Sequence, residues 1–386
     1  MRSFIANSRN ALGTVNTFFG AVMFLLATLS AAADAAETKR VLMLYSFGPE
    51  SSWNQYAKNI RAELEQQSRW PLEISDYSIV TARSSDEDSP FVEYLRALHA
   101  KWPFDLVVCL GAPAVVFVQR HRQELLANTP MVFTAFEQRR IQYSTLTAND
   151  TVVALAHSFP AIFDDILRVL PDTKTVAVVN GNSPNENFWV EQIRKDASRF
   201  ADRLTFKWYN ELSFEDILKD AAALPPHSAI FWHLMNVDAA GRTHERDSRE
   251  LKRLYAVADA PIFSHTDTSF GDGIVGGPMH SVSELSRLAA SVAIRILGGE
   301  KAGGIKTPAS GFATPKFDWR EMQRWGISES SLMPGSEIYF RELTVWEQYR
   351  AAILMIAAVM VLQAALIFWL LHERAQRRRS ELKRMS

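Results

Sequence analysis

Short apolar runs alternate with longer amphipathic segments along most of the chain. Runs such as RVLMLYSF and FDLVVCLG in the first part are each followed by a segment whose apolar positions have helical spacing. The alternation restarts at AIFDDILRVL and continues through TKTVAVVNG, SAIFWHLMN and APIFSHT. Near-continuous apolar strands separated by helices are typical of parallel sheets covered on both faces. The pattern therefore predicts an α/β protein with two doubly wound parallel-sheet lobes.

The two series also set the expected domain boundaries. Lobe one is expected to comprise approximately residues 40–155 and 278–325, and lobe two approximately residues 156–277. Together they form one two-lobed unit over residues 37–345. In open α/β sheets, ligands bind beyond the carboxyl ends of the strands. Two such lobes are expected to leave a ligand cleft between them, which hinge closure can shut on a small molecule.

The first 36 residues have the pattern of an export signal. Arg2 and Arg9 precede the apolar stretch FFGAVMFLLATL, and alanines with the spacing accepted by signal peptidase follow it. We therefore predict a signal peptide over residues 1–36, and the alternative is an uncleaved N-terminal anchor. Both alternatives place the following residues outside the cytoplasm.

The last part of the chain predicts a membrane helix. Residues 351–371 are apolar apart from Gln363. As a helix, this stretch is long enough to cross the ~30 Å hydrocarbon layer. We predict a transmembrane helix over residues 349–371, followed by a basic tail over residues 372–386. Positive charge flanks membrane helices on the cytoplasmic side, so the tail is expected in the cytoplasm and the two-lobed unit on the opposite side.

Composition narrows the function classes. The chain has 386 residues, a hydrophobic fraction of 47% and a formal net charge of -1. This charge provides no basic field for nucleic acid, so nucleic acid is excluded as a partner. The single cysteine, Cys109, lies in an apolar run and has no partner for an internal disulfide, so we assign it no chemistry.

A glycine-rich segment matches a nucleotide-binding pattern only formally. Residues 271–276, GDGIVG, fit G-x-G-x-x-G, but Pro278 interrupts the helix that should follow, and the segment lies late in the chain. We interpret it as a crossover between lobes, where glycine allows turning, hinge motion or close approach to a ligand. No cofactor is predicted.

Catalytic and metal-binding patterns are weak as well. Glu245 follows His244 without a second histidine at helical spacing, no serine lies in G-x-S-x-G, and Ser264, His265 and Asp267 are too contiguous to form a triad. The histidines at 233, 244, 265 and 280 are interpreted as polar residues near a cleft and not as metal ligands. We therefore predict no catalytic residue and no metal.

Small, hydroxyl-bearing and aromatic residues follow the predicted strands. Backbone and hydroxyl groups before a helix can hold an anion, while aromatic rings provide flat apolar walls. The alternative for each residue is ordinary turn or N-cap chemistry. The candidate ligand-binding residues are Ser46, Phe47, Gly48, Trp53, Gly111, Ala112, Thr134, Phe136, Asn180, Asn182, Tyr209, Asn236, His265 and Asp267.

The chain resembles a known family in these segments. The two β-α series, the turn APIFSHTDTSFGDGIVGG, the helix SELSRLAASVAIRILGGE and the closing FDWREMQRWGI look like ABC-type substrate-binding proteins of the periplasmic binding protein type I class. The segment RWGISESSLMPGSEIYFRELTVWEQYR, which runs into the membrane helix, resembles the form used as the extracytoplasmic sensor of bacterial membrane histidine kinases. The resemblance implies a bacterial inner-membrane location with the main domain in the periplasm.

The resemblance leaves two function classes open. No kinase module follows the basic tail, so kinase activity is not carried over and we do not expect an enzyme. The first hypothesis is a membrane-anchored receptor, the sensor part of a signal-transduction system; the alternative is an anchored solute-binding component of an ABC-type importer. The expected partners are the membrane and a small organic ligand, for example an amino acid or an aromatic or carboxylate metabolite. A homodimer, a separate kinase and a permease chain remain open as further partners.

Overall fold

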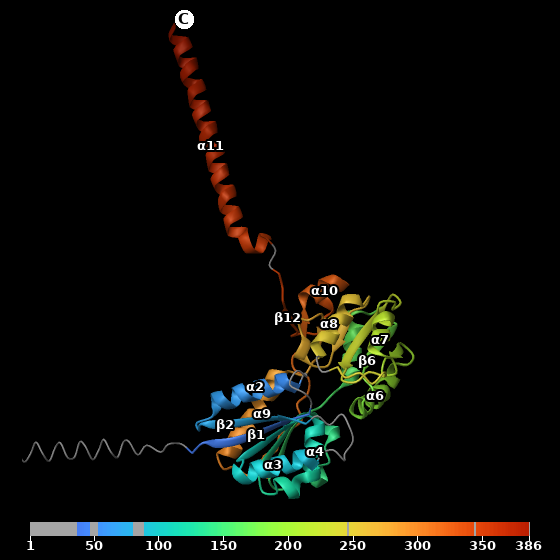
Figure 1. Cartoon of the computed structure of the whole chain (residues 1–386). Helices are drawn as coiled ribbons and strands as arrows, with labels where there is room; N and C mark the ends of the chain where they lie inside the picture. Colours follow the sequence, from blue (N-terminus) through green and yellow to red (C-terminus); the bar gives the residue numbers. More distant parts are fainter. Residues whose placement is uncertain (1–36, 47–52, 80–88, 245–246, 343–344, 386) are drawn as a thin grey trace, which may run out of the picture.

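The computed structural model describes most of the chain in two lobes followed by one long helix (Figure 1). The described ranges are 37–46, 53–79, 89–244, 247–342 and 345–385. The predicted signal segment lies outside the described residues. The α/β architecture with parallel sheets covered by helices is the one that the alternating pattern predicts.

Lobe one is built on a five-stranded sheet in the order β2-β1-β3-β4-β5, and all of its strand pairs are parallel. Its strands are β1 (Lys39–Tyr45), β2 (Leu72–Ser78), β3 (Leu106–Leu110), β4 (Met131–Glu137) and β5 (Asp150–Leu155). Alternate residues of each strand face opposite sides. Val41 therefore belongs to one core and Leu42 to the other.

Helices cover both faces of this sheet, which is why its central strands are apolar on both sides. Two helices that are distant in sequence, α2 (Trp53–Gln67) and α9 (Val282–Leu297), lie side by side on one face (Figure 1). On the other face lie α3 (Ser89–Lys101) and α4 (Ala112–Leu125).

Lobe two repeats the plan with a four-stranded parallel sheet in the order β7-β6-β8-β9. Its strands are β6 (Thr175–Asn180), β7 (Thr205–Trp208), β8 (Ser228–Leu234) and β9 (Ile262–Ser264). Helices α5 (Phe159–Val169) and α6 (Pro184–Ala197) pack on one face, and α7 (Phe214–Ala221) and α8 (Asp247–Val257) on the other. Short 3-10 helices complete the described fold: η2 (Gln138–Arg140), η3 (Tyr143–Thr145), η4 (Ser198–Phe200), η5 (Asp267–Ser269), η6 (Ala302–Gly304) and η7 (Glu329–Ser331).

Within the described residues, the chain passes between the two cores in three places. The first crossing follows Leu155 and the second precedes Val282, both of which belong to the core of lobe one. The third crossing, around Gly311, lies between them: Ser310 pairs with Leu155, and the amide of Ala313 donates to the carbonyl of Met279 at 2.9 Å. The lobes are thus joined by three hydrogen-bonded segments.

A small sheet closes lobe two and corrects one expected boundary. Strands β10 (Gly276–Gly277), β11 (Lys316–Asp318) and β12 (Glu337–Tyr339) form it, with α10 (Trp319–Trp325) between the last two. The prediction placed residues 278–325 in lobe one. Helix α9 does pack there, but Phe317 and Met322 are buried in the core of lobe two, so the segment from Lys316 onward packs with lobe two.

The glycine-rich segment serves this small sheet. Gly276 has φ +133°, and a Cβ placed on it would lie 2.2 Å from the carbonyl oxygen of Lys316 in β11. A side chain at this position would separate β10 from β11. Close approach is therefore needed here to a neighbouring strand. The interpretation of residues 271–276 as a crossover between lobes was wrong, because Ile274 and Val275 are buried in the cores of lobe two.

The C-terminal helix α11 (Val345–Met385) extends away from lobe two as one rod (Figure 1). In the part of the chain that the structure describes, Tyr349–Arg377 is the one helical stretch long and apolar enough to cross a membrane by length and composition. None of its most apolar window is buried against the lobes. Its apolar surface is therefore left for a partner other than the core of this chain.

Candidate functional site: the pocket between the lobes

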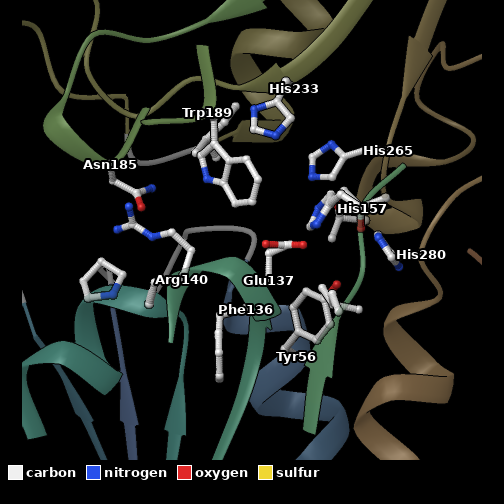
Figure 2. Close-up of a pocket in the computed structure, with 16 residues that line it drawn as sticks. Tyr56, Phe136, Glu137, Arg140, His157, Asn185, Trp189, His233, His265 and His280 are labelled. Carbon is white, nitrogen blue, oxygen red and sulfur yellow. The ribbon is translucent and has the colours of Figure 1, made fainter. Parts of the chain in front are cut away.

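A pocket lies where the carboxyl ends of the two sheets face each other (Figure 2). Its cavity volume is about 60 Å³, which is room for roughly four to six water-sized groups. The residues that line it come from both lobes and from the crossings: Tyr56, Ala112, Pro113, Phe136, Glu137, Arg140, Leu155, His157, Asn185, Trp189, His233, Leu234, His265, Thr266, Thr268 and His280. The predicted cleft between two doubly wound lobes is confirmed.

Four histidines form one side of this pocket. His157 and His280 lie on two of the crossings, whereas His233 and His265 lie in or just after strands β8 and β9. Ring centroids are 4.6 Å apart for His157 and His280, 5.1 Å for His157 and His265, and 4.4 Å for His233 and His265. Histidines from four separate segments thus meet at the junction of the lobes.

Burial keeps this histidine cluster uncharged at neutral pH. It lowers the pKa of His233 to about 3 and that of His280 to about 4. The pKa values of His157 and His265 lie well below the ordinary range, first because of burial and then because neighbouring imidazoles disfavour a second positive charge. A neutral imidazole has one N–H donor and one lone pair, so each ring can both donate and accept.

Two of the rings have a fixed tautomer. His280 Nδ1 donates to the carbonyl of Gly311 at 3.1 Å. His233 Nδ1 donates to Asn180 Oδ1 at 2.7 Å, because the amide nitrogen of Asn180 is used in donating to the carbonyls of Gly181 and Glu186. In both neutral rings Nε2 is therefore the acceptor, and both Nε2 atoms are buried without a hydrogen bond within the described residues.

Trp189 forms a flat wall beside the histidines. It lies in α6, is 7% exposed, and its ring centroid is 5.0 Å from that of His157 and 5.4 Å from that of His233. Phe159 supports it from the core of lobe two with an edge-to-face contact at 6.0 Å. The ring is thus fixed by packing and presents an apolar surface to the pocket.

Charged residues lie on the side formed by lobe one. Glu137, the last residue of β4, is 1% exposed, and its carboxylate accepts from the backbone and side-chain nitrogens of Arg139 at 2.7 and 3.0 Å. Arg140 stacks on Phe188 with 4.4 Å between its guanidinium carbon and the ring centroid. Burial lowers the pKa of Arg140, but an arginine remains charged at neutral pH. Among the described residues Arg140 has no ion-pair partner, so the pocket carries a positive charge.

Three predicted ligand-binding residues line the pocket: Ala112, Phe136 and His265. Gly111 immediately precedes Ala112 as the N-cap of α4, with φ 84°. Phe47 and Gly48 lie outside the described residues. Trp53 begins α2, and its side chain lies outside the described part.

The other candidates do not line the pocket. Ser46 joins β1 to the start of α4, because its hydroxyl donates to the carbonyl of Leu110 and accepts from the amide of Ala114. Tyr209 is buried on the opposite face of lobe two, where its hydroxyl donates to Asp220 at 2.5 Å. The remaining residues have these places: Thr134 is buried in β4, Asn180 lies behind His233, Asn182 is exposed, Asn236 is buried after β8, and Asp267 accepts from the amide of Val282 and from Lys316.

Sequence reasoning left out much of the pocket. Glu137 lies in a strand-end segment but was not selected as a candidate. His233 and His280 were interpreted as polar residues near a cleft and do line the pocket, although they were not among the ligand-binding candidates, whereas His244 lies against Asp238 and Glu250 outside it. Trp189 and Tyr56 lie within helices, where periodicity assigns aromatic residues to the core. The crossings offered a usable signal: His157 and His280 lie two or three residues beyond the boundaries predicted between the lobes.

The histidine cluster does not form a metal site in this arrangement. In the described part of the chain, no group of three or more histidine, cysteine, aspartate or glutamate side chains is placed to hold a metal ion. Two of its rings, His233 and His265, are stacked with an interplanar angle of 26°.

Comparison with known proteins identifies the fold. No family model matches the chain, and no curated protein sequence matches it. Solved structures do. An ABC domain from Streptococcus pneumoniae in complex with L-Trp has a TM-score of 0.58 at 16% identity, covering 78% of this chain and 100% of its own. A conserved domain protein from Vibrio cholerae has a TM-score of 0.57 at 15% identity over the same shares.

A third structure shows the same likeness. A ligand-free, open substrate-binding protein with adhesive properties from Clostridium difficile has a TM-score of 0.54 at 13% identity, covering 79% of this chain and 100% of its own. The two-lobed part of this chain therefore has the fold of the ABC-type substrate-binding proteins, which are periplasmic binding protein type I-like.

Proposed function

We propose that this protein is a membrane-tethered extracytoplasmic receptor, in which closure of the two lobes on a small organic ligand is passed to the membrane helix. The fold supports the ligand-binding half of this proposal. The observation that supports transmission to the membrane helix is a contact. The segment that leads to α11 packs directly on the loop that lines the pocket.

This attachment starts at the pocket. Thr266 and Thr268 line the cavity, and η5, which contains Thr268, leads to Phe270. The ring of Phe270 meets Tyr339 of β12 edge-to-face at 5.7 Å and lies 5.5 Å from Phe340. Only a few residues separate Phe340 from the first residue of α11. A shift of the pocket loop therefore reaches the membrane helix over a short path.

Arg320 stabilises the same contact between the pocket loop and the segment that contains Phe340. Its guanidinium lies 4.4 Å from the ring centroid of Phe340, donates to the carbonyl of Gly271 at 3.0 Å, and pairs with Asp318 at 2.6 Å. Phe340 itself has φ 55°, a left-handed conformation that is rare for a bulky residue and costs of the order of 1–3 kcal/mol. The surrounding contacts hold the exit segment in this conformation.

The membrane arrangement completes the proposal. Tyr349–Arg377 has the length and composition of a membrane span, and Trp346 and Tyr349 precede it, where aromatic rings favour the interface. The basic residues after the span favour a cytoplasmic tail. We place the lobes in the periplasm of a bacterium, with the export signal at residues 1–36 and a separate signalling chain as the receiver.

An anchored importer component is the second candidate, because substrate-binding proteins of ABC transporters share this fold. Both candidates require ligand binding, and they differ in whether α11 responds to it. Co-purification of a permease, combined with an α11 that does not respond to ligand, would favour the importer.

The binding function is tested by replacing Trp189 with alanine. A metabolite panel screened by thermal shift on the full chain in detergent should include a compound that raises the melting temperature of the wild type, because ligand stabilises only the folded state, by about 2.7 kcal/mol at a concentration of 100 Kd. Trp189→Ala should abolish most of that shift by removing the flat wall.

The matched control is Trp102→Ala, which removes an exposed tryptophan outside the pocket. It should leave the ligand-dependent shift unchanged. Equal shifts in wild type and Trp189→Ala would contradict binding at this pocket.

The transmission function is tested at Phe340. A spin label at position 346, in a Cys109→Ala background, should change its mobility when ligand binds. Phe340→Ala should remove most of this change while altering the ligand Kd by less than about threefold, because Phe340 contacts the pocket loop but does not line the cavity. Tyr143→Ala, another exposed aromatic residue, is the control. A ligand response that survives in Phe340→Ala would rule out this path.

A further inference from the structure

Given the proposed receptor function, we infer that the ligand is a small ring compound with a single carboxylate group and no ammonium group beside it. Its carboxylate would lie toward Arg140, its ring against Trp189, and a hydroxyl or ring N–H group toward the histidine cluster. The inference is drawn from charge, shape and hydrogen-bonding groups that face one another across the pocket.

The charges set the sign of the ligand. Arg140 is the charged pocket-lining residue without an ion-pair partner among the described residues, whereas Glu137 is paired with Arg139. A half-buried guanidinium is best satisfied by a carboxylate, which can accept two parallel hydrogen bonds. Asn185 also lines the pocket, and its side-chain amide can donate to a carboxylate. One unpaired cation matches one negative charge.

The same arrangement disfavours an α-amino acid. In such a ligand the ammonium group is attached next to the carboxylate, so a carboxylate bound at Arg140 would bring the ammonium close to this guanidinium. Glu137 is the carboxylate that lines the described pocket, and both of its oxygens already accept from Arg139. The ammonium would then lack a free counter-charge, and leaving a charge unpaired on burial is costly.

The shape of the pocket limits the apolar part. Trp189 provides a flat surface on which a ring can stack, and aromatic pairs gain about 0.5–1.5 kcal/mol beyond their buried area. The volume of about 60 Å³ is smaller than the ~150 Å³ cavity that takes up benzene, so the pocket must widen for any ring. One ring with a short acid group requires less widening than a two-ring compound. Figure 2 shows Trp189 between the Arg140 side and the histidine side, so a stacked ring would reach both.

The histidines determine which ligand group fits on the side of the pocket opposite Arg140. His233 and His280 are 3% and 1% exposed, and their Nε2 atoms are buried acceptors with no hydrogen bond within the described residues. A buried polar atom without a partner costs about 1–3 kcal/mol. A small adjustment of the rings as the lobes close would pair them with a hydroxyl or N–H donor. A second charge is not required, since the imidazoles are neutral.

The experiment compares matched probes by calorimetry on the full chain in detergent. The probes are 4-hydroxybenzoate, its neutral amide 4-hydroxybenzamide, the ring acid nicotinate, L-tyrosine, L-tryptophan and myo-inositol. We expect 4-hydroxybenzoate to bind at least tenfold more tightly than its amide and than L-tyrosine. It should also bind more tightly than nicotinate, whose ring nitrogen is an acceptor and cannot donate to the Nε2 atoms of His233 and His280. This comparison needs no variant and is independent of folding defects.

Arg140→Gln then tests the assigned contact. It should weaken binding of the acid at least tenfold and that of the amide by less than threefold, and Arg140→Lys should retain part of the affinity for the acid. The control is Arg203→Gln, which removes an exposed arginine of a distant turn. Equal affinity for acid and amide, or an unchanged affinity in Arg140→Gln, overturns the inference.

The outcomes separate this inference from the proposed function. If L-tyrosine, L-tryptophan or myo-inositol binds in a Trp189-dependent manner and the acids do not, the receptor function stands and the ligand class is wrong. If no probe binds and the wider metabolite panel also produces no thermal shift, both proposals fail.

Discussion

Lowering the pH from about 7.5 to about 5.5 is expected to destabilise the protein by several kcal/mol. The cause is the histidine cluster at the junction of the lobes. In the unfolded chain these imidazoles take up protons near their ordinary pKa of 6.5, whereas His280 does so only at about 4 and His233 at about 3 in the folded protein. The unfolded state therefore binds more protons throughout this window.

Because of that difference, the free energy of unfolding falls as the pH is lowered. The stability contributed by the neutral histidines is fully present above pH 6.5 and is lost as the pH falls toward their folded-state pKa values. Each histidine contributes a slope of up to about 1.4 kcal/mol per pH unit, and the cluster together up to about 5 kcal/mol per unit. Arg139 acts in the same direction, since its charge also lowers the pKa of His157.

Chemical denaturation of the full chain at several pH values measures this slope. His280→Gln, which can still donate to Gly311, should give a shallower slope below pH 6.5 because one titrating group is removed. The control is His227→Asn at an exposed position with φ 64°, which asparagine tolerates. A pH profile that is the same for wild type and His280→Gln would show that the cluster does not carry the effect.

Replacing Glu186 with alanine is expected to cost about 3–5 kcal/mol of folding free energy. Glu186 is fully buried near the start of α6 and accepts from the amides of Ser183, Asn236 and Val237 at 3.0, 2.6 and 3.3 Å. It also completes the capping box of α6 with Ser183. Alanine would leave three amides without an acceptor at the junction of α6 and β8.

Urea denaturation compares this variant with two others. Glu186→Gln keeps the shape and one acceptor oxygen, so it should lose less than Glu186→Ala. Glu191→Ala, an exposed glutamate of the same helix, should change the free energy of unfolding by less than about 0.5 kcal/mol. A loss in Glu186→Ala no larger than that in Glu191→Ala would contradict the assigned role. Because Trp189 lies one turn further along α6, ligand binding should weaken as well.

The fold could be predicted because its signal is local. Each apolar run corresponds to a buried strand and each amphipathic run to a covering helix, so the alternation alone specifies two doubly wound lobes. The assignment of the segment after α9 could not be predicted. Whether Phe317 packs with one core or the other depends on where the third crossing leads, and no local pattern encodes that.

The pocket could be predicted only in part, for a different reason. The carboxyl ends of strands meet at one edge of a sheet, which brings Ala112, Phe136 and His265 to the pocket. The same rule does not say to which face a strand-end side chain points. Tyr209 shows this limit, because it follows an edge strand and points into the core between the sheet and α7.

The remaining pocket residues depend on tertiary placement. Trp189 reaches the pocket because of the rotation of α6 about its axis, which the Glu186 contacts fix. His157 and His280 are far apart in sequence and meet because the crossings that carry them are held together through the segment around Gly311. Sequence spacing contains neither relation.

The three joined crossings have a mechanical consequence. Segments bound to one another by hydrogen bonds resist sliding, so the natural relative movement of the lobes is rotation about a line that runs through them. Points on that line stay in place while distant points sweep through an arc. A ligand that enters the opened molecule would meet His157 and His280 already in position. Rotation of the lobes would then bring Trp189 and Arg140 toward the ligand from opposite sides.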